Sequence, residues 1–451
     1  MFASSILLTS YLNLFLHASL SLLLTLLLSL LNIPSLFLYA LNTYIHPDDV
    51  SPNNSNTRAA IRRPGAPEAE LRPRKKGKQS FEFDENKAQI FRLKLSHAHL
   101  QSRLHFDQFH KAFSSAFVAL FSVVMHLFLK VDRDNGVLEN ATIVPVLLCF
   151  VGVFRVCVLV FLVSFERSAS KRLDKQCSVV LGILGFVIGV MFVLDVFPKW
   201  AFDIRLGFLD GFGRFVVSVA MGCLAGLLYM PAARNARAFW LGTDQSRSYL
   251  SIISCGWIER LLLYGSSLLA IFTALLWISP FADLLINKNI ASGRKGSMSD
   301  ELVGNVGMSS SDFDKFRQLC LLVVGVLQMV TLRSNLQIFL NEAVLSWYQR
   351  LHASKVPDLE FSRAKVFLHN HYLCLVALQF FAPPALVLLF LGLSRIGDDL
   401  HKNIQLLCGL LPCTALVNEV ALFMAWWVVF VWSIFTAGSL ALYRRGILYV
   451  S

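Results

Sequence analysis

Long apolar blocks separated by short polar stretches dominate the pattern of the chain. Each block runs for about 18 to 25 residues, the length that a helix needs to cross a hydrocarbon core of about 30 Å. A soluble fold has no use for so many such blocks, so the pattern predicts an all-α polytopic transmembrane bundle of about nine spans. After the first block, the predicted spans are 112–129, 142–165, 177–197, 213–231, 260–281, 317–333, 367–393 and 417–442.

The first block, 4–41, contains no Asp, Glu, Lys or Arg and is too long for one perpendicular span. We expect Asn32 and Pro34 to divide it into a span and an interfacial segment, which together form an N-terminal unit, 1–43. No basic region precedes the block and no small-x-small cleavage site follows it, which favours a retained helix over a cleaved signal peptide. Cleavage would leave eight spans.

The polar segments around this unit differ in kind. Residues 44–85 combine prolines with a basic cluster, which predicts a disordered cytosolic linker that either contacts anionic lipid or only fixes orientation. Residues 86–111 alternate first at period two and then near helical spacing, which predicts an amphipathic juxtamembrane element whose first half is either strand or helix. The bundle, 112–451, contains a second amphipathic stretch at 336–351 and a short apolar piece at 404–416. The cluster is Arg72, Arg74, Lys75, Lys76 and Lys78.

Composition agrees with a membrane protein: 55% of residues are hydrophobic, only 16% are charged, and the formal net charge is +12. The basic residues lie mainly in the linker and beside the ends of apolar blocks, which indicates topology and contact with the lipid bilayer and argues against nucleic acid. Loops after the first, third, fifth and seventh spans are basic, as is the C-terminus at Arg444 and Arg445. The positive-inside rule therefore predicts a lumenal or extracellular N-terminus and a cytosolic C-terminus, which requires an odd number of spans.

No motif for catalysis, phosphate binding or dinucleotide binding occurs in the chain. Histidines gather before the second span, but their spacing does not place them on one helical face, as a helical metal site would need. We therefore predict no enzyme activity, no cofactor and no metal site. These histidines are His97, His99, His105 and His110.

Ionisable residues in and beside the spans are the candidate functional residues. Arg155 lies near the middle of the third span, where a guanidinium costs about 3 kcal/mol by insertion scales, so we expect it to face the bundle interior. Its candidate partners are Asp195 and Glu419. Two hypotheses stay open, namely a permeation or proton pathway and a structural ion pair that fixes helix register. Further ionisable candidates are Arg214, Glu259 and Arg260, and weaker polar positions are His126, Gln328, Gln379 and Asn418.

Small residues and prolines bear on how the spans pack. G-x-x-x-G motifs at 185–189 and 222–226 favour close helix contact, within the bundle rather than between copies. The Pro383-Pro384 pair should kink or interrupt the eighth span, because two carbonyls lose their donors.

Several segments give the chain a family resemblance. They are Phe313-Asp314 with Arg317, Arg333-Ser334-Asn335-Leu336-Gln337, Tyr372-Leu373-Cys374, Ala377-Leu378-Gln379-Phe380-Phe381-Ala382-Pro383, Trp426-Trp427 and His46-Pro47. On these the chain resembles the transmembrane protein 161 family (predicted transmembrane protein 161A/B). The resemblance implies a multi-pass protein of endomembranes or the cell surface, and animal members are associated with control of ion currents and with stress responses. The family has no defined catalytic motif, so no functional residue is carried over.

Three functions remain as hypotheses. The first is modulation of ion transport, membrane excitability or stress response, either by partnering a channel or by weak conduction through Arg155 and the carboxylates. The second is a membrane scaffold or assembly factor without a transport pathway. The third, a membrane-embedded enzyme, has only the scattered histidines in its favour.

Overall fold

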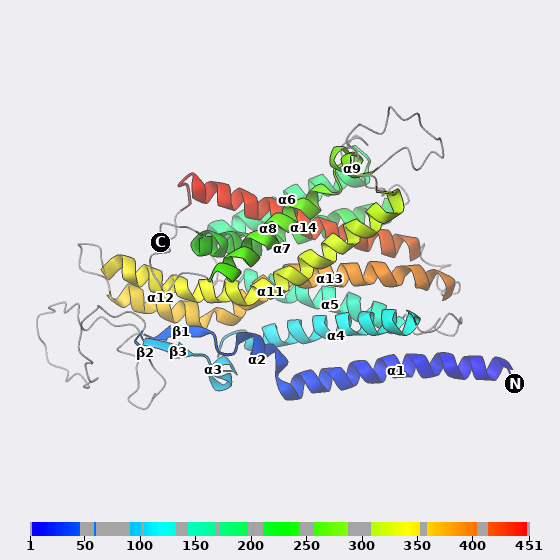
Figure 1. Ribbon diagram of the computed structural model, residues 1–451, viewed down its shortest axis with the longest axis horizontal. Coiled ribbons are helices and arrows are strands. Elements are labelled where there is room, and N and C mark those ends of the chain that lie inside the picture. The colour runs from blue at the N-terminus through cyan, green and yellow to red at the C-terminus, as the bar shows by residue number, and fades with distance from the viewer. Residues whose placement is uncertain are drawn as a thin grey trace, which may run out of the picture.

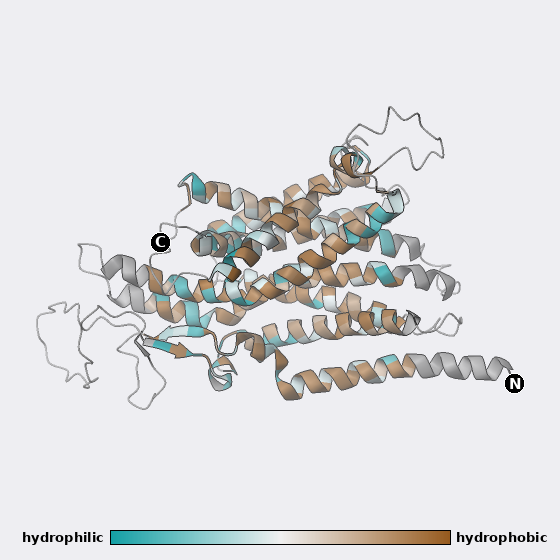
Figure 2. Cartoon of the chain, in the orientation of Figure 1, coloured by the Kyte–Doolittle hydropathy of each residue, from teal (hydrophilic) through white to brown (hydrophobic). Residues whose placement is uncertain are grey.

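Among the described residues, nine helices are long and apolar enough to cross a membrane. A helix is the expected form, because in lipid it satisfies its backbone hydrogen bonds internally. In the computed structural model they run along a common axis, hydrophobic over much of their length, with the two termini at opposite ends (Figures 1 and 2). They are α1 (Phe2–Leu31), α4 (Phe106–Val131), α5 (Ile143–Ser164), α6 (Arg172–Val193), α7 (Gly211–Thr243), α8 (Trp257–Leu275), α11 (Ser310–Leu351), α13 (Leu373–Asn403) and α14 (Thr414–Arg444).

The structure describes most of the chain, with its gaps mainly in polar segments. The described residues are 2–45, 58–59, 91–101, 103–131, 143–166, 172–196, 202, 211–243, 256–286, 308–351, 359–403 and 414–448. Most of the linker predicted at 44–85, its basic cluster, and most of the apolar piece at 404–416 lie outside these residues, so the expectations for them stay predictions.

The first apolar block divides where the sequence predicts. Helix α1 ends at Leu31, and Asn32 takes a left-handed conformation with φ 47°. Asparagine adopts that conformation at lower cost than most residues. The short helix α2 (Ile33–Leu38) then starts with Pro34 in its first turn, where a missing N–H costs nothing. Helix α1 lies at the edge of the bundle and packs mainly against α4.

A small antiparallel sheet adds to the predicted all-α class. Strand β3 (Phe91–Lys94) lies between β1 (Asn42–Ile45) and β2 (Arg58–Ala59). This settles the choice left open for 86–111: the period-two part that is described forms a strand, and α3 (His97–Gln101) follows it. The sheet and the C-terminus occupy one end of the bundle, called here the sheet end (Figure 1).

Helix α11 corrects the expectation of a separate amphipathic stretch at 336–351. It runs without a break for 42 residues and includes that stretch. Leu336, Ile338 and Leu340 are buried, and the helix packs there against β1 and α12 (Leu359–His371). Up to Leu345, where the described side chains of this helix end, the apolar face therefore meets protein rather than the membrane surface. A further short helix, α9 (Ser279–Leu285), follows α8.

Helix α13 is the centre of the bundle. In its span Leu373–Ile396, 89% of the residues of the most apolar window are buried, and it packs against α14, α11, α4 and α5. The sequence predicts that the prolines kink or interrupt the span; the helix continues through Pro383 and Pro384, so an interruption is wrong and a kink stays a prediction. Packing on all sides supports the helix where two of its hydrogen bonds are lost.

Two tryptophans connect α14 to its neighbours. The indole Nε1–H of Trp426 donates to the carbonyl of Ala274 at 3.1 Å, and that of Trp427 donates to the carbonyl of Met221, also at 3.1 Å. Ala274 lies in the last turn of α8, where carbonyls have no donor within the helix. Both rings are buried, so each polar N–H has the partner that its environment requires.

The two glycine motifs pack against each other, as expected for contact within the bundle. A Cβ built on Gly185 of α6 would lie 2.5 Å from the Ala225 Cβ of α7, and one on Gly222 would lie 2.7 Å from the Phe186 Cβ. The backbones are close enough for Ser178 Oγ to donate to the Gly226 carbonyl at 2.6 Å. Only hydrogen fits at these positions.

This packing predicts different effects for the same Gly→Ala substitution at two positions. Gly185→Ala inserts a methyl group into the α6–α7 contact and should destabilise the protein by about 1–3 kcal/mol. Gly265→Ala in α8 is the control, because nothing lies within 4 Å of its Cβ. Thermal unfolding in detergent micelles should show a lower melting temperature for Gly185→Ala and an unchanged or slightly higher one for the control. Equal melting temperatures would contradict the close contact.

Candidate functional site

Arg155 does not face the bundle interior, and that expectation is wrong. It lies near the middle of the 22-residue helix α5 and is exposed on the outer face. Its neighbours on that face are apolar: Phe154 is 70% exposed, Val151 45% and Val158 37%. The sequence indicated its depth, but both faces of α5 are apolar, so it could not indicate the direction.

The two carboxylates expected to pair with Arg155 lie at helix ends. Asp195 lies two residues beyond the end of α6 and is exposed, with a left-handed φ of 52°. The backbone N–H of Asp195 donates to the Phe192 carbonyl, and the N–H of Val196 donates to the Met191 carbonyl. These two bonds form the pattern of a Schellman cap. Asp195 therefore ends a helix. Glu419 is exposed within the second turn of α14.

The remaining ionisable candidates also occupy helix ends. Arg214 is half-buried in the first turn of α7, and Glu259 and Arg260 are half-buried in the first turn of α8. Glu259 suits that place, because the N-terminus of a helix favours a negative charge. None of the six candidates lines the polar cavity that the bundle contains.

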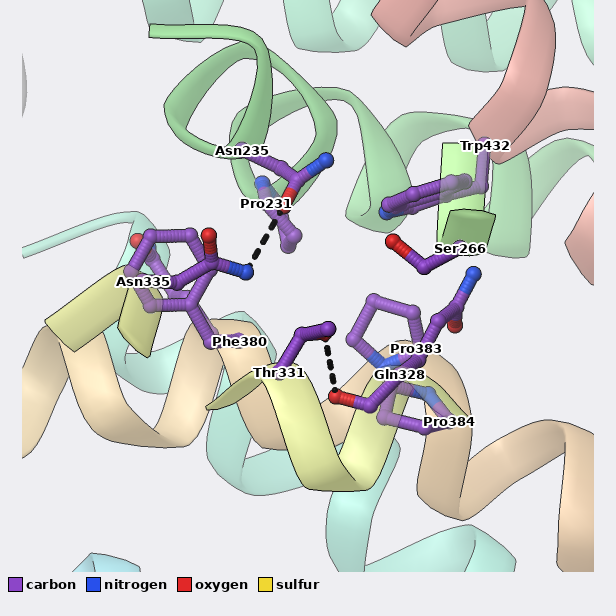
Figure 3. Close-up of a pocket in the computed structure, with 11 residues that line it drawn as sticks. Pro231, Asn235, Ser266, Gln328, Thr331, Asn335, Phe380, Pro383, Pro384 and Trp432 are labelled. Carbon is purple, nitrogen blue, oxygen red and sulfur yellow. Dashed lines mark hydrogen bonds between the residues drawn. The ribbon is translucent and has the colours of Figure 1, made fainter. Parts of the chain in front are cut away.

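That cavity lies where five helices meet. The open space has a volume of about 10 Å³, enough for about one water molecule. Figure 3 shows polar side chains from α7, α8 and α11 around it, together with the proline pair of α13 and a tryptophan of α14. The lining residues are Pro231, Asn235, Ser266, Gln328, Thr331, Asn335, Gln379, Phe380, Pro383, Pro384 and Trp432.

Hydrogen bonds hold these polar groups in place. Asn335 Nδ2 donates to Asn235 Oδ1 at 3.1 Å, joining α11 to α7. The amide of Gln379 reaches the other way and donates to Ser164 Oγ of α5 at 3.0 Å. Thr331 Oγ1 donates to the carbonyl of Gln328 on its own helix at 3.0 Å. Each bond removes part of the cost of burying a polar group.

A buried ion-pair cluster lies nearer the sheet end. Arg237 of α7 donates to the Oε1 of Glu342 on α11, whose side chain is 4% exposed. His369 Nε2 of α12 lies 3.9 Å from the same oxygen, while its Nδ1 lies 2.8 Å from the carbonyl of Lys365. Because a carbonyl oxygen can only accept, Nδ1 carries a proton and donates it to this carbonyl. Nε2 is the ring nitrogen that faces the carboxylate.

Strand β1 attaches to this cluster through side-chain amides. Gln337 accepts from the backbone N–H of Asn42 at 2.9 Å and donates to its carbonyl at 3.1 Å, as a neighbouring strand would. Tyr44 Oη donates to Asn341 Oδ1 at 2.9 Å. Burial raises the pKa of Tyr44 to about 12, so the phenol remains a donor at physiological pH. Asn370 Nδ2 donates to the Tyr44 carbonyl at 2.8 Å.

One helix face carries both groups. Gln328, Thr331, Asn335 and Glu342 follow one another on α11 at spacings of three, four and seven residues, which places them on one side of a helix. We call this row the polar stripe of α11. Over 14 residues it extends about 21 Å, from the cavity to the ion pair.

The family model of the predicted transmembrane protein 161AB family matches residues 112–405. The chain belongs to this family. No solved structure matches it. The matched region contains the polar stripe and the Arg237–Glu342 pair, together with ten of the eleven residues that line the cavity, all but Trp432.

In this transmembrane protein 161 family member, the residues that suggested the resemblance join separate elements. Arg317 of α11 lies over the ring of Trp277 at 5.1 Å, a cation–π contact. Arg333 donates to the Tyr39 carbonyl at 3.3 Å. Gln337, Asn335 and Gln379 make the contacts described above, as do the two tryptophans. His46-Pro47 lies outside the described residues.

The sequence indicated the residues of the cavity and of the ion pair only in part. Gln328 and Gln379 stood out as polar positions within spans, but Arg237 and Glu342 did not, because they lie beyond the predicted ends of their spans. The usable signal was the polar stripe, which becomes visible once α11 is read as one helix.

The interior offers ion-pair and hydrogen-bond chemistry. Among the described residues, no group of three or more His, Cys, Asp or Glu side chains could hold a metal ion. Near the second span, His97 Nδ1 lies 2.8 Å from Ser35 Oγ and His99 Nδ1 lies 2.8 Å from Ser96 Oγ. The side-chain amides of the cavity can bind a small ligand, but they cannot act as general acids or bases.

The ion pair predicts coupled losses of stability. Arg237→Gln should destabilise the protein by on the order of 3 kcal/mol, because it removes the arginine that pairs with the buried Glu342 carboxylate. Glu342→Gln should cost less, because the Arg237 side chain that it leaves behind is 31% exposed. The double variant should lose less than the sum of the two. Lys315→Gln is the control, since its pair with Asp312 is exposed and contributes under about 1 kcal/mol. A double-mutant cycle of unfolding free energies measures the coupling, and additive losses would contradict it.

Proposed function

We propose that this protein modulates ion transport as the partner of another membrane protein and does not itself conduct. The observation that carries the proposal is Arg155, a charge exposed near mid-span on an apolar outer face. A scaffold role would use the same surface but leave currents unchanged. A membrane-embedded enzyme has the least support.

The energetics of Arg155 favour a protein neighbour over lipid. A guanidinium at the centre of a span costs about 3 kcal/mol by insertion scales, and a carboxylate on an adjacent helix would remove most of that cost. Arginine can bind such a carboxylate through two parallel hydrogen bonds. Asp195 and Glu419 of this chain are at helix ends, so a second copy would present them at a different depth. The partner should therefore be another protein with an acidic residue at mid-span.

The packing of the interior argues against conduction. The central helix α13 is enclosed by its neighbours, and the cavity beside it has space for about one water molecule. The carboxylate of Glu342 is occupied by Arg237. The link to ion transport rests on the family resemblance, whose animal members are associated with ion currents and stress responses.

The compartment and orientation also belong to the proposal. The resemblance favours the endomembrane system or the plasma membrane. The charge pattern favours a lumenal or extracellular N-terminus and a cytosolic C-terminus, and termini at opposite ends of the bundle are compatible with it (Figure 1). This orientation places the sheet end in the cytosol, where the basic linker can contact anionic lipid.

The orientation has a direct test. In sealed endoplasmic reticulum microsomes, a protease added outside should digest a C-terminal epitope tag and leave an N-terminal tag intact. Opening the vesicles with detergent is the control and should expose both tags. Digestion of the N-terminal tag in sealed vesicles would contradict the orientation.

The proposed function predicts that Arg155 is needed for an effect on current but not for folding. Expression of the wild type should change endogenous whole-cell currents, and Arg155→Gln should abolish the change at equal abundance of folded protein, because the docking charge is lost. Arg172→Gln, the same substitution at an exposed position where α6 begins, is the matched control and should behave as the wild type.

Purified protein in liposomes completes the test, since it should give no ion flux above that of empty vesicles. Flux through the purified protein would overturn the proposal in favour of conduction. An unchanged effect of Arg155→Gln on whole-cell current would remove the docking role of Arg155. No current change with the wild type would favour the scaffold.

A further inference from the structure

Unpartnered acceptors line the cavity at the centre of the bundle. Gln379 is fully buried and Asn335 is 5% exposed, and both line the cavity. The Oε1 of Gln379 and the Oδ1 of Asn335 are buried and accept no hydrogen bond. An oxygen left in this state costs about 1–3 kcal/mol, so the pair points to a ligand that can satisfy them.

The proline pair adds two more acceptors. Pro383 and Pro384 lack an N–H, so the carbonyls four residues earlier, those of Gln379 and Phe380, lose their helical donors. Both of these residues line the cavity. In membrane transporters, backbone carbonyls without helical donors coordinate monovalent cations.

Four donors around the cavity are already engaged. The hydroxyl of Ser266 donates to the Leu263 carbonyl at 3.0 Å, and that of Thr331 donates to the Gln328 carbonyl at 3.0 Å. The amide nitrogens of Asn335 and Gln379 donate to Asn235 and Ser164, as described above. Two buried side-chain atoms of the lining residues lack a hydrogen-bond partner, and both are acceptors.

We propose that this cavity binds one small monovalent cation, the size of sodium or potassium. A single water molecule has two hydrogens and would leave two of the four acceptors unsatisfied, whereas a cation can be coordinated by all four. A divalent ion is disfavoured, because calcium and magnesium sites are built with carboxylates and this lining has only neutral oxygens. The aromatic ring of Trp432 also lines the cavity and attracts a positive charge (Figure 3).

Such an ion would join the helices of the centre. Asn335 belongs to α11 and Gln379 to α13, and Asn335 is bonded to Asn235 of α7. A bound cation would therefore tie three spans together, and its occupancy would shift the equilibrium between packed and looser arrangements. The site lies inside the bundle, so the inference goes beyond the proposed role of Arg155 and does not depend on it.

The test compares salts at constant ionic strength. Purified full-length protein in detergent is unfolded by heat in sodium chloride, potassium chloride and choline chloride. Sodium or potassium should raise the melting temperature by several degrees over choline, in a saturable way, because choline is too large for the cavity. Gln379→Leu should abolish the difference between the salts. Gln176→Leu, at an exposed position of α6, is the matched control and should keep it.

A second variant covers the case in which Gln379→Leu fails to fold. Asn335→Asp adds a charged acceptor at the same position and should lower the cation concentration for half-maximal stabilisation at least several-fold. Equal melting temperatures of the wild type in all three salts would overturn the proposal and leave the cavity to water. An unchanged cation dependence in Asn335→Asp would overturn it as well.

Discussion

A polar group inside a membrane bundle has no bulk water to bond to and must find its partner within the protein. That constraint accounts for the centre of this structure. Asn335 bonds to Asn235, Gln379 bonds to Ser164, and the two tryptophans of α14 donate to carbonyls of α7 and α8. Because each bond joins two elements, the polar groups fix the relative positions of helices whose apolar surfaces could pack in many ways.

The proline pair of α13 leaves two carbonyls subject to this constraint. A helix surrounded by four others can lose two backbone hydrogen bonds and remain helical, but the freed carbonyls still need a partner. Their residues line the same cavity as two side-chain oxygens that also lack a partner. The cation site proposed here is the consequence of an excess of acceptors in a place that has room for one small guest.

The outer surface shows the opposite situation. Arg155 meets none of the buried partners available inside and instead lies among exposed Val, Phe and Leu side chains. Within a single chain this arrangement is costly, and a carboxylate from another membrane protein would offset the cost. Interior and exterior thus suggest different roles, since the cavity concerns the state of the bundle and Arg155 concerns its neighbours.

The sequence by itself determined the membrane class, the nine apolar helices, the break at Asn32 and the close packing of the glycine motifs within the bundle, because these depend on hydropathy and on local backbone preference. Tertiary structure alone decided which way Arg155 faces, that α11 continues to Leu351, and that Arg237 meets Glu342 across 105 positions of the chain. The physical reason is that periodicity identifies a polar face only where a helix has one apolar side. In a bundle whose helices are apolar all round, the direction of a single polar residue is set by the packing of the whole.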